Sequence, residues 1–273
     1  MDNIIPNTFV LIVIMDSPII LETHDLRKEF GGLVAVAGVN IQIQAHTLHS
    51  IIGPNGAGKT TFFNLLSGNL KPTQGKVMYK GRDITQLPAF QRAHMGIGRS
   101  YQITNIFPNL TVLENIRLAA QAIGKDSFRF WKSHEHFSTY LDRAYQVLAQ
   151  VGLEDETNAL GRTLSHGNQR KLELAILLAS DPETLLLDEP TAGMAREEIP
   201  LLMAVIQSIR KEHAKTILLV EHKMDLVMNV SDRITVMHNG EVLAEGTPSE
   251  IAANKTVQSA YLGDLYGDFS EVG

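Results

Sequence analysis

The stretch Gly53-Pro54-Asn55-Gly56-Ala57-Gly58-Lys59-Thr60-Thr61 decides the fold of this chain. It matches the pattern G-x4-G-K-[ST], follows an apolar run at residues 48–52 and opens a helix-forming stretch at residues 59–67. Glycines let the backbone wrap around an anion with its N–H groups inward, and the helix dipole adds to the attraction. We therefore expect a strand, a phosphate-binding loop and a helix. Lys59 is predicted to contact β- and γ-phosphates, Thr60 to bind Mg²⁺ and Thr61 to contact the α-phosphate.

A second acidic element lies about 130 residues downstream, where residues 184–187 form an apolar run that ends in Asp188-Glu189-Pro190. A strand without polar alternation is typical of a parallel sheet covered by helices on both faces. Ligands bind at the carboxyl ends of such strands. We therefore expect Asp188 to hold Mg²⁺ through water and Glu189 to polarise an attacking water.

The remaining pattern predicts an α/β protein. Two strands at 19–26 and 39–44, joined by a turn at Gly31-Gly32, precede the loop, and a short strand at 77–79 follows it. The middle of the chain reads as helix, at about 113–119 and 140–151, and predicts an inserted helical subdomain. Further elements are expected as helices at 169–179, 199–212 and 225–230, and as strands at 216–220, 233–238 and 241–244, the last two joined by Asn239-Gly240.

Composition narrows the class of protein. The chain has 273 residues, a formal net charge of −6 and no cysteine, which argues against a strongly basic nucleic-acid binder and excludes disulfides and thiolate chemistry. The longest apolar run, residues 9–15, is far shorter than the roughly 20 residues of a spanning helix. Residues 1–18 are predicted to form an N-terminal tail that is not necessarily native, because Met15 is an alternative start.

Five elements in this order resemble the ATP-binding subunit of ABC transporters: the phosphate loop, Gln102 after a strand-like segment, Leu164-Ser165-His166-Gly167-Asn168, the Asp188-Glu189 strand, and His222. The resemblance covers residues 19–263, nearly the whole chain. It implies a P-loop NTPase core with a mostly parallel sheet, an antiparallel β part and a helical subdomain at about 105–165. It also implies ATP hydrolysis with ATP and Mg²⁺, and leaves residues 264–273 as an acidic tail.

The family's residues carry over to matching positions of this sequence. Phe30 stands where an aromatic ring stacks on adenine, with a core phenylalanine as the alternative. Gln102 matches a glutamine that reaches Mg²⁺ and the attacking water, and His222 matches a histidine that contacts the γ-phosphate. Ser165 and Gly167 match residues that bind the γ-phosphate held by the opposite subunit. The usual family sequence there is Leu-Ser-Gly-Gly-Gln, so His166 and Asn168 depart from it.

The subgroup and its partners are also implied by resemblance. Three segments resemble the corresponding sequences in ATPase subunits of importers for branched-chain and other hydrophobic amino acids. They are Thr191-Ala192-Gly193-Met194, the run at 31–36 and the closing Tyr261-Leu262-Gly263. A urea or short-amide importer and a lipid or polysaccharide exporter are the alternatives. Expected partners are membrane permease subunits, a second ATPase subunit (this chain or a paralogue) and, indirectly, a solute-binding protein, with no nucleic acid. The subunit would lie peripherally on the cytoplasmic face of the membrane, docked through residues 102–117.

A non-transport ATPase, a kinase and a GTPase are weaker alternatives. Non-transport ATPases of this type usually carry two sets of ATPase motifs in one chain, coiled-coil arms or basic tracts. The Asn-Lys-x-Asp motif with which a GTPase recognises guanine is absent from the sequence. Because one chain carries a single phosphate loop and a single Leu-Ser-x-Gly element, a complete site is expected to need two subunits arranged head to tail.

Overall fold

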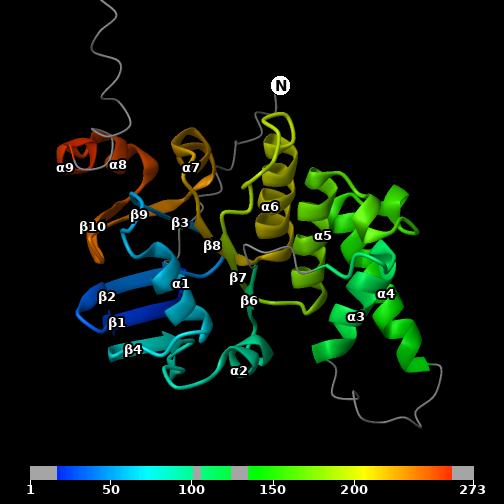
Figure 1. Cartoon of the computed structure of the whole chain (residues 1–273), viewed down its shortest axis with the longest axis horizontal. Coiled ribbons are helices and arrows are strands. Elements are labelled where there is room, and N and C mark those ends of the chain that lie inside the picture. The colour runs from blue at the N-terminus through cyan, green and yellow to red at the C-terminus, as the bar shows by residue number, and fades with distance from the viewer. Residues whose placement is uncertain (1–16, 101–105, 124–134, 260–273) are drawn as a thin grey trace, which may run out of the picture.

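A computed structural model describes residues 17–100, 106–123 and 135–259, and within them the largest sheet has six strands in the order β10-β9-β3-β8-β7-β6. The strands from β9 to β6 run parallel, and β10 is antiparallel to β9 (Figure 1). Their bounds are β3 Leu48–Ile52, β6 Ile97–Arg99, β7 Thr184–Asp188, β8 Thr216–Val220, β9 Arg233–His238 and β10 Glu241–Gly246. The predicted parallel core is confirmed.

A second, antiparallel sheet has the strand order β2-β1-β4-β5. Its strands are β1 Ile19–Phe30, β2 Leu33–Gln44, β4 Gln74–Tyr79 and β5 Arg82–Asp83. The predicted first two strands were too short because the β1–β2 ladder is irregular. Its register shifts between Thr23 and Leu26, and Asp25 has a positive φ of 46°. Such a bulge breaks the alternation from which strands are predicted.

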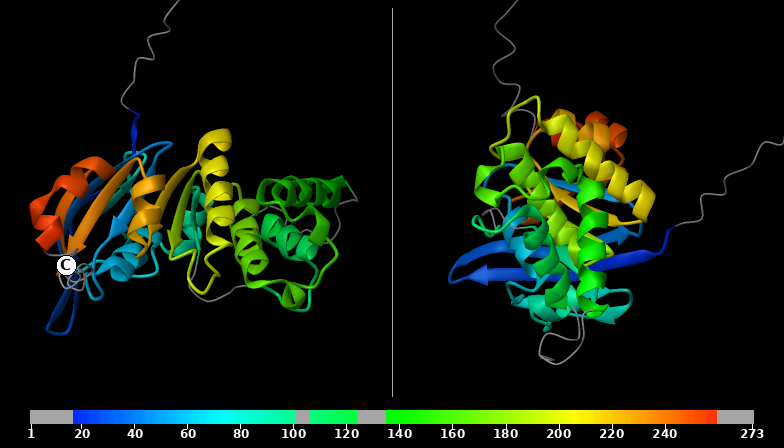
Figure 2. Two further views of the ribbon diagram at one scale, coloured as in Figure 1. Left: turned by 90° about the horizontal axis from the view of Figure 1, so that it is seen from above. Right: turned by 90° about the vertical axis from the view of Figure 1, so that its right-hand side faces the viewer.

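Helices cover both faces of the large sheet. Helix α1 (Lys59–Ser67) lies between the two sheets, whereas α5 (His166–Ala179) and α6 (Ile199–His213) pack on the other face (Figures 1 and 2). Beyond α5 lie α3 (Val112–Ile123) and α4 (Glu135–Val151), and two single turns, at Glu154–Glu156 and Gly161–Thr163, lead back to α5. The last helices are α7 (Met224–Val230), α8 (Pro248–Ala253) and α9 (Lys255–Val257).

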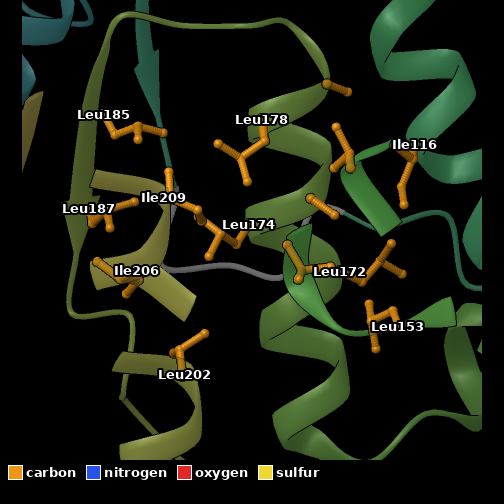
Figure 3. Packing of buried hydrophobic residues seen from close by; sticks show 14 of the residues in the cluster. Ile116, Leu153, Leu172, Leu174, Leu178, Leu185, Leu187, Leu202, Ile206 and Ile209 are labelled. Atoms are coloured by element: carbon orange, nitrogen blue, oxygen red, sulfur yellow. The ribbon is translucent and has the colours of Figure 1, made fainter. Parts of the chain in front are cut away.

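The apolar strand β7 explains how the layers are held together. Leu185 and Leu187 pack with leucines and isoleucines of α5 and α6, as Figure 3 shows, whereas Leu186 belongs to the cluster on the α1 side. All five residues of β7 are buried. Because both faces of the strand are covered, it has no polar alternation, as its sequence indicated.

Helix α2 (Ala89–His94) was not predicted, because it is short and its main contact is polar. Its Arg92 is fully buried and donates to the backbone oxygens of Leu65, Leu66, Thr85 and Leu87. A buried arginine that satisfies the carbonyls at the end of α1 leaves no periodic apolar pattern in the sequence.

The predicted subdivision of the chain stays a prediction. Helices α3 and α4 share one apolar cluster with α5 and with residues of β7, β8 and α6, so packing is continuous across the proposed boundary. The predicted tails fall almost wholly outside the described residues, which begin at 17 and end at 259. In the described part of the chain, the search for a helix with the length and apolarity of a membrane span found none.

Candidate nucleotide site

The loop between β3 and α1 holds its lysine folded inward. The Lys59 Nζ donates to the backbone oxygens of Gly53 at 2.6 Å and Pro54 at 3.0 Å. Burial lowers the pKa of Lys59, while the nearby Glu189 and Asp188 carboxylates act in the opposite direction. A cation held in a ring of backbone groups next to two carboxylates can bind a phosphate chain.

Gly58 shows why this position of the loop needs glycine. Its φ is +95°, and a Cβ there would lie 2.3 Å from the backbone oxygen of Ala35 on β2. The β1–β2 hairpin therefore passes directly beside the phosphate loop. The hairpin also carries Phe30, whose ring is 45% exposed and has the Lys28 Nζ 5.0 Å from its centroid. This exposure contradicts the core alternative for Phe30 and leaves the ring available for stacking.

Asp188 ends β7 in a buried environment and is only 4% exposed. Burial raises its pKa, and the Arg99 guanidinium, 3.3 Å from Oδ2, acts against that rise. Its buried Oδ1 has no hydrogen-bond partner among the described residues. A carboxylate oxygen aimed at no protein donor suits a hard cation such as Mg²⁺. Thr60 is exposed at the start of α1.

Side chains within residues 17–100, 106–123 and 135–259 supply too few ligands for a metal cage. Among the described residues, no group of three or more His, Cys, Asp or Glu side chains is placed to hold a metal ion. Mg²⁺ commonly binds through one or two protein groups, with phosphate oxygens and waters completing its octahedron. Asp188 and Thr60 therefore fit a magnesium ion that arrives with a nucleotide.

Glu189 and His222 come from the ends of neighbouring strands and meet. The His222 Nε2 and Glu189 Oε1 are 2.5 Å apart, and both side chains are partly exposed. Glu189 has a left-handed backbone with φ 48°, and its N–H donates to the Val220 oxygen at 2.9 Å. The sequence predicted both residues as catalytic, and they lie together.

The Leu-Ser-x-Gly element lies on the other face of β7. Ser165 caps α5 by accepting from the Asn168 N–H at 3.2 Å. A Cβ on Gly167 would lie 2.5 Å from Oε1 of Glu198, so only glycine fits there without a shift. Helix α5 packs against Leu185 and Leu187, whereas α1, which follows the phosphate loop, packs on the side of Leu186 (Figure 1). Gln102 lies outside the described residues.

Four further residues lie beside these groups and were not among the predicted site residues. Arg99 donates to Asn64 Oδ1 at 2.7 Å and to Ser67 Oγ at 2.6 Å besides contacting Asp188, and Ser100 Oγ accepts from the Asp188 N–H at 3.1 Å. Thr191 and Glu221 are hydrogen-bonded to each other beside the Glu189–His222 pair. Thr191 belongs to the Thr191-Ala192-Gly193-Met194 motif, which was interpreted only as a subgroup signal, and the other three were marked only by their proximity to motif residues.

Two protein-family models match this chain. The model described as ABC transporter matches residues 36–192, and the model described as branched-chain amino acid ATP-binding cassette transporter matches residues 241–265. One curated relative is LivG of Escherichia coli K12, described as a high-affinity branched-chain amino acid transport ATP-binding protein. It is 42% identical over 255 residues, which cover 92% of this chain and all of LivG.

Solved structures show the same fold. A nucleotide-free ATP-binding cassette from an ABC transporter is 28% identical with a TM-score of 0.77, covering 89% of this chain and 99% of that one. A dimeric cassette bound to ADP and Pi is 28% identical with a TM-score of 0.70, covering 84% and 98%. With the phosphate loop, the Asp188-Glu189 strand end and His222 gathered at one sheet edge, these matches show that the chain belongs to the ABC transporter family as an ATP-hydrolysing subunit.

Proposed function

We propose that this subunit energises the uptake of branched-chain or other hydrophobic amino acids. The 42% identity to LivG and the family model over residues 241–265 support this cargo. Both favour it over a urea or short-amide importer and over a lipid or polysaccharide exporter. The permeases and the solute-binding protein would select the transported molecule, because this chain contributes ATP hydrolysis.

One observation carries the catalytic assignment: the 2.5 Å contact between Glu189 and His222 beside the buried Asp188 and Lys59. In the proposed site, backbone amides of the phosphate loop bind the phosphates of ATP. This loop is formed by Gly53, Pro54, Asn55, Gly56, Ala57, Gly58, Lys59, Thr60 and Thr61. Glu189 orients the attacking water. His222 can donate and accept, so it links Glu189 to the γ-phosphate.

Mg²⁺ is proposed to bind with ATP between Asp188 and Thr60, with Gln102 as a further contact. When bound, it neutralises charge on the phosphate oxygens. The Oδ1 of Asp188, to which no residue in the described ranges donates a hydrogen bond, supports this placement. Phe30 would stack on the adenine, because its exposed ring stands on the hairpin that borders the phosphate loop.

The working unit is proposed to be a head-to-tail pair of ATPase subunits, either two copies or this chain with a paralogue. Ser165 and Gly167 lie on the face of β7 opposite to α1, so they serve the phosphate loop of a second subunit better than their own. The dimeric cassette with ADP and Pi is a structural precedent for pairing. Closure on two ATP molecules and reopening after hydrolysis would drive the permease.

The permease is proposed to dock on residues 102–117, on the cytoplasmic face of the membrane. In the described part of this segment Phe107 is 57% exposed. Its backbone is fixed by Asn115, whose side chain accepts from the Phe107 N–H at 2.7 Å and donates to the Phe107 and Thr111 oxygens. An exposed ring on a fixed loop is suited to a protein contact.

Co-purification from native membranes, with partners identified by mass spectrometry, tests this proposal. We expect two permease subunits and a second ATPase subunit, with cross-links from the permeases to residues 102–117. A matched sample carrying Phe107→Ala should lose permease while keeping ATPase activity. Recovery with ribosomes or DNA, and without any membrane protein, would contradict the transport role.

A further inference from the structure

A buried carboxylate lies directly behind the Glu189–His222 pair. Glu221 follows β8, precedes His222 and is only 3% exposed. Its Oε1 accepts from the Thr191 N–H at 3.1 Å and from the Thr191 hydroxyl at 2.7 Å. Its Oε2 accepts from the backbone N–H of His222 at 3.2 Å. One carboxylate thus binds the backbones of both segments that carry the pair.

The bond to Thr191 acts on the turn that aims Glu189. The Ala192 N–H donates to the Glu189 oxygen at 3.0 Å, which closes a turn over residues 189–192, and Glu189 itself has φ 48°. A non-glycine residue in this conformation costs free energy unless its surroundings hold it. Thr191 is fully buried inside this turn, and its side chain and N–H both bind Glu221.

The contacts explain why this position carries a glutamate. Within the described part of the chain, the three groups that hydrogen-bond to the Glu221 carboxylate all donate to it, and a carboxylate can accept at both oxygens. The Lys223 Nζ, 3.1 Å from Thr191 Oγ1, supplies a neighbouring positive charge. A glutamine of the same shape would place an NH₂ donor against a donor on one side.

We infer that Glu221 is a positioning residue that sets the distance between Glu189 and His222 by holding the 189–192 turn and the backbone of His222 together. The inference rests on the proposed roles of Glu189 and His222. The Glu221 carboxylate is bound by Thr191 and by the His222 N–H, so it acts through these two neighbours. Misplacing a catalytic group by about 1 Å costs on the order of 100-fold in rate.

The test compares Glu221→Gln and Glu221→Ala with Thr191→Val and Thr191→Ser. Glu250→Ala is the matched control, because Glu250 also accepts a backbone N–H, from Thr247 at 2.7 Å, but caps α8. For each purified full-length variant, kcat, the ATP dissociation constant and the melting temperature are measured. Each change is then repeated in a His222→Ala background.

We expect Glu221→Gln, Glu221→Ala and Thr191→Val to lower kcat by about 10- to 100-fold while ATP affinity stays within about twofold of the parent. Thr191→Ser keeps the hydroxyl and should retain activity, and Glu250→Ala should keep kcat. In the His222→Ala background, the Glu221 changes should cost less than in the parent, because the part of their effect that passes through His222 is already lost.

Normal kcat in folded Glu221→Gln and Thr191→Val would overturn the inference, as would fully additive losses with His222→Ala. If Glu221→Ala does not fold, the kcat values of the isosteric variants Glu221→Gln and Thr191→Val still test the inference. Failure of the underlying site assignment looks different: His222→Ala and Glu189→Gln would themselves keep normal turnover, whatever the Glu221 variants do.

Discussion

The two faces of β7 differ in how many of the predicted site residues lie close to one another. On the phosphate-loop side, Lys59, Asp188 and Glu189 interact electrostatically, and His222 contacts Glu189 within one chain. On the α5 side, Ser165 and Gly167 begin a well-capped helix that packs into the apolar cluster behind the sheet. The difference supports the proposal that one face carries the reaction centre and that the other face binds the nucleotide of a second subunit.

The largest expected effect comes from the assembled face. Glu189→Gln keeps the shape of the side chain and removes the carboxylate that is proposed to orient water, so kcat should fall about 100-fold or more. ATP binding should persist, and the paired state should accumulate with ATP, as measured by size-exclusion chromatography with light scattering. Turnover at the parent rate would remove Glu189 from its role. Glu197→Gln, an acid near the same segment, is the control.

Mixing variants tests whether the two faces belong to different subunits. Lys59→Ala and Ser165→Ala should each be nearly inactive alone. In a mixed homodimer, one composite site carries both defects and the other carries neither, so mixing should restore about a quarter of the parent ATPase rate. The rate is measured after co-expression of differently tagged chains. Absence of any recovery would argue that the two copies do not share sites.

A smaller effect is expected at the edge of the assembled face. Phe30→Ala removes the proposed stacking surface for adenine, which is worth about 1–2 kcal/mol, or about 5- to 30-fold in the ATP dissociation constant. Isothermal titration calorimetry measures it. Leu33→Ala is the matched control, since Leu33 is exposed on the same hairpin. Equal affinities for Phe30→Ala and the parent would leave Phe30 without a nucleotide role.

The smallest effect concerns the sheet beneath the phosphate loop. His49 of β3 is fully buried, with Nε2 2.7 Å from Thr235 Oγ1, and burial lowers its pKa from 6.5 to about 3. The unfolded chain binds a proton below pH 6.5 and the folded chain does not, so stability falls as pH drops from about 6.5 toward 3. This residue alone should remove about 1 kcal/mol between pH 6 and pH 5.

Denaturant unfolding at several pH values measures this contribution of His49 to the free energy of unfolding. His49→Gln should flatten the pH dependence of the free energy of unfolding by that amount relative to the parent chain. An identical slope in His49→Gln and the parent would mean that His49 does not titrate differently on unfolding.

Most of the fold could be predicted from local patterns in the sequence. The strand at Leu48–Ile52 and the helix at Lys59–Ser67 have their predicted bounds, because the loop between them has an unmistakable pattern. Neither the bulge at Asp25 nor the burial of Arg92 could be predicted from the sequence. A bulge interrupts the period on which a strand is recognised, and a buried arginine looks like a surface residue until its carbonyl partners are placed.

The candidate site was predictable where a motif marks it and not where tertiary contacts build it. Asp188, Glu189 and His222 follow apolar strands, so sheet topology alone gathers them at one edge. Arg99, Thr191 and Glu221 were found through hydrogen bonds between residues 30 to 89 positions apart in the chain, from the Thr191–Glu221 bond to the Arg99–Asp188 bond. No spacing rule covers such pairs, and only the folded chain reveals them.

The left-handed backbone at Glu189 has a consequence for how such subunits evolve and are engineered. A glycine there would relieve a conformational cost of about 1–2 kcal/mol. Selection for thermal tolerance alone would therefore reward loss of the carboxylate on which hydrolysis is proposed to depend. A library screened for heat resistance should be expected to collect inactive chains altered at this position, and a turnover screen has to run beside it.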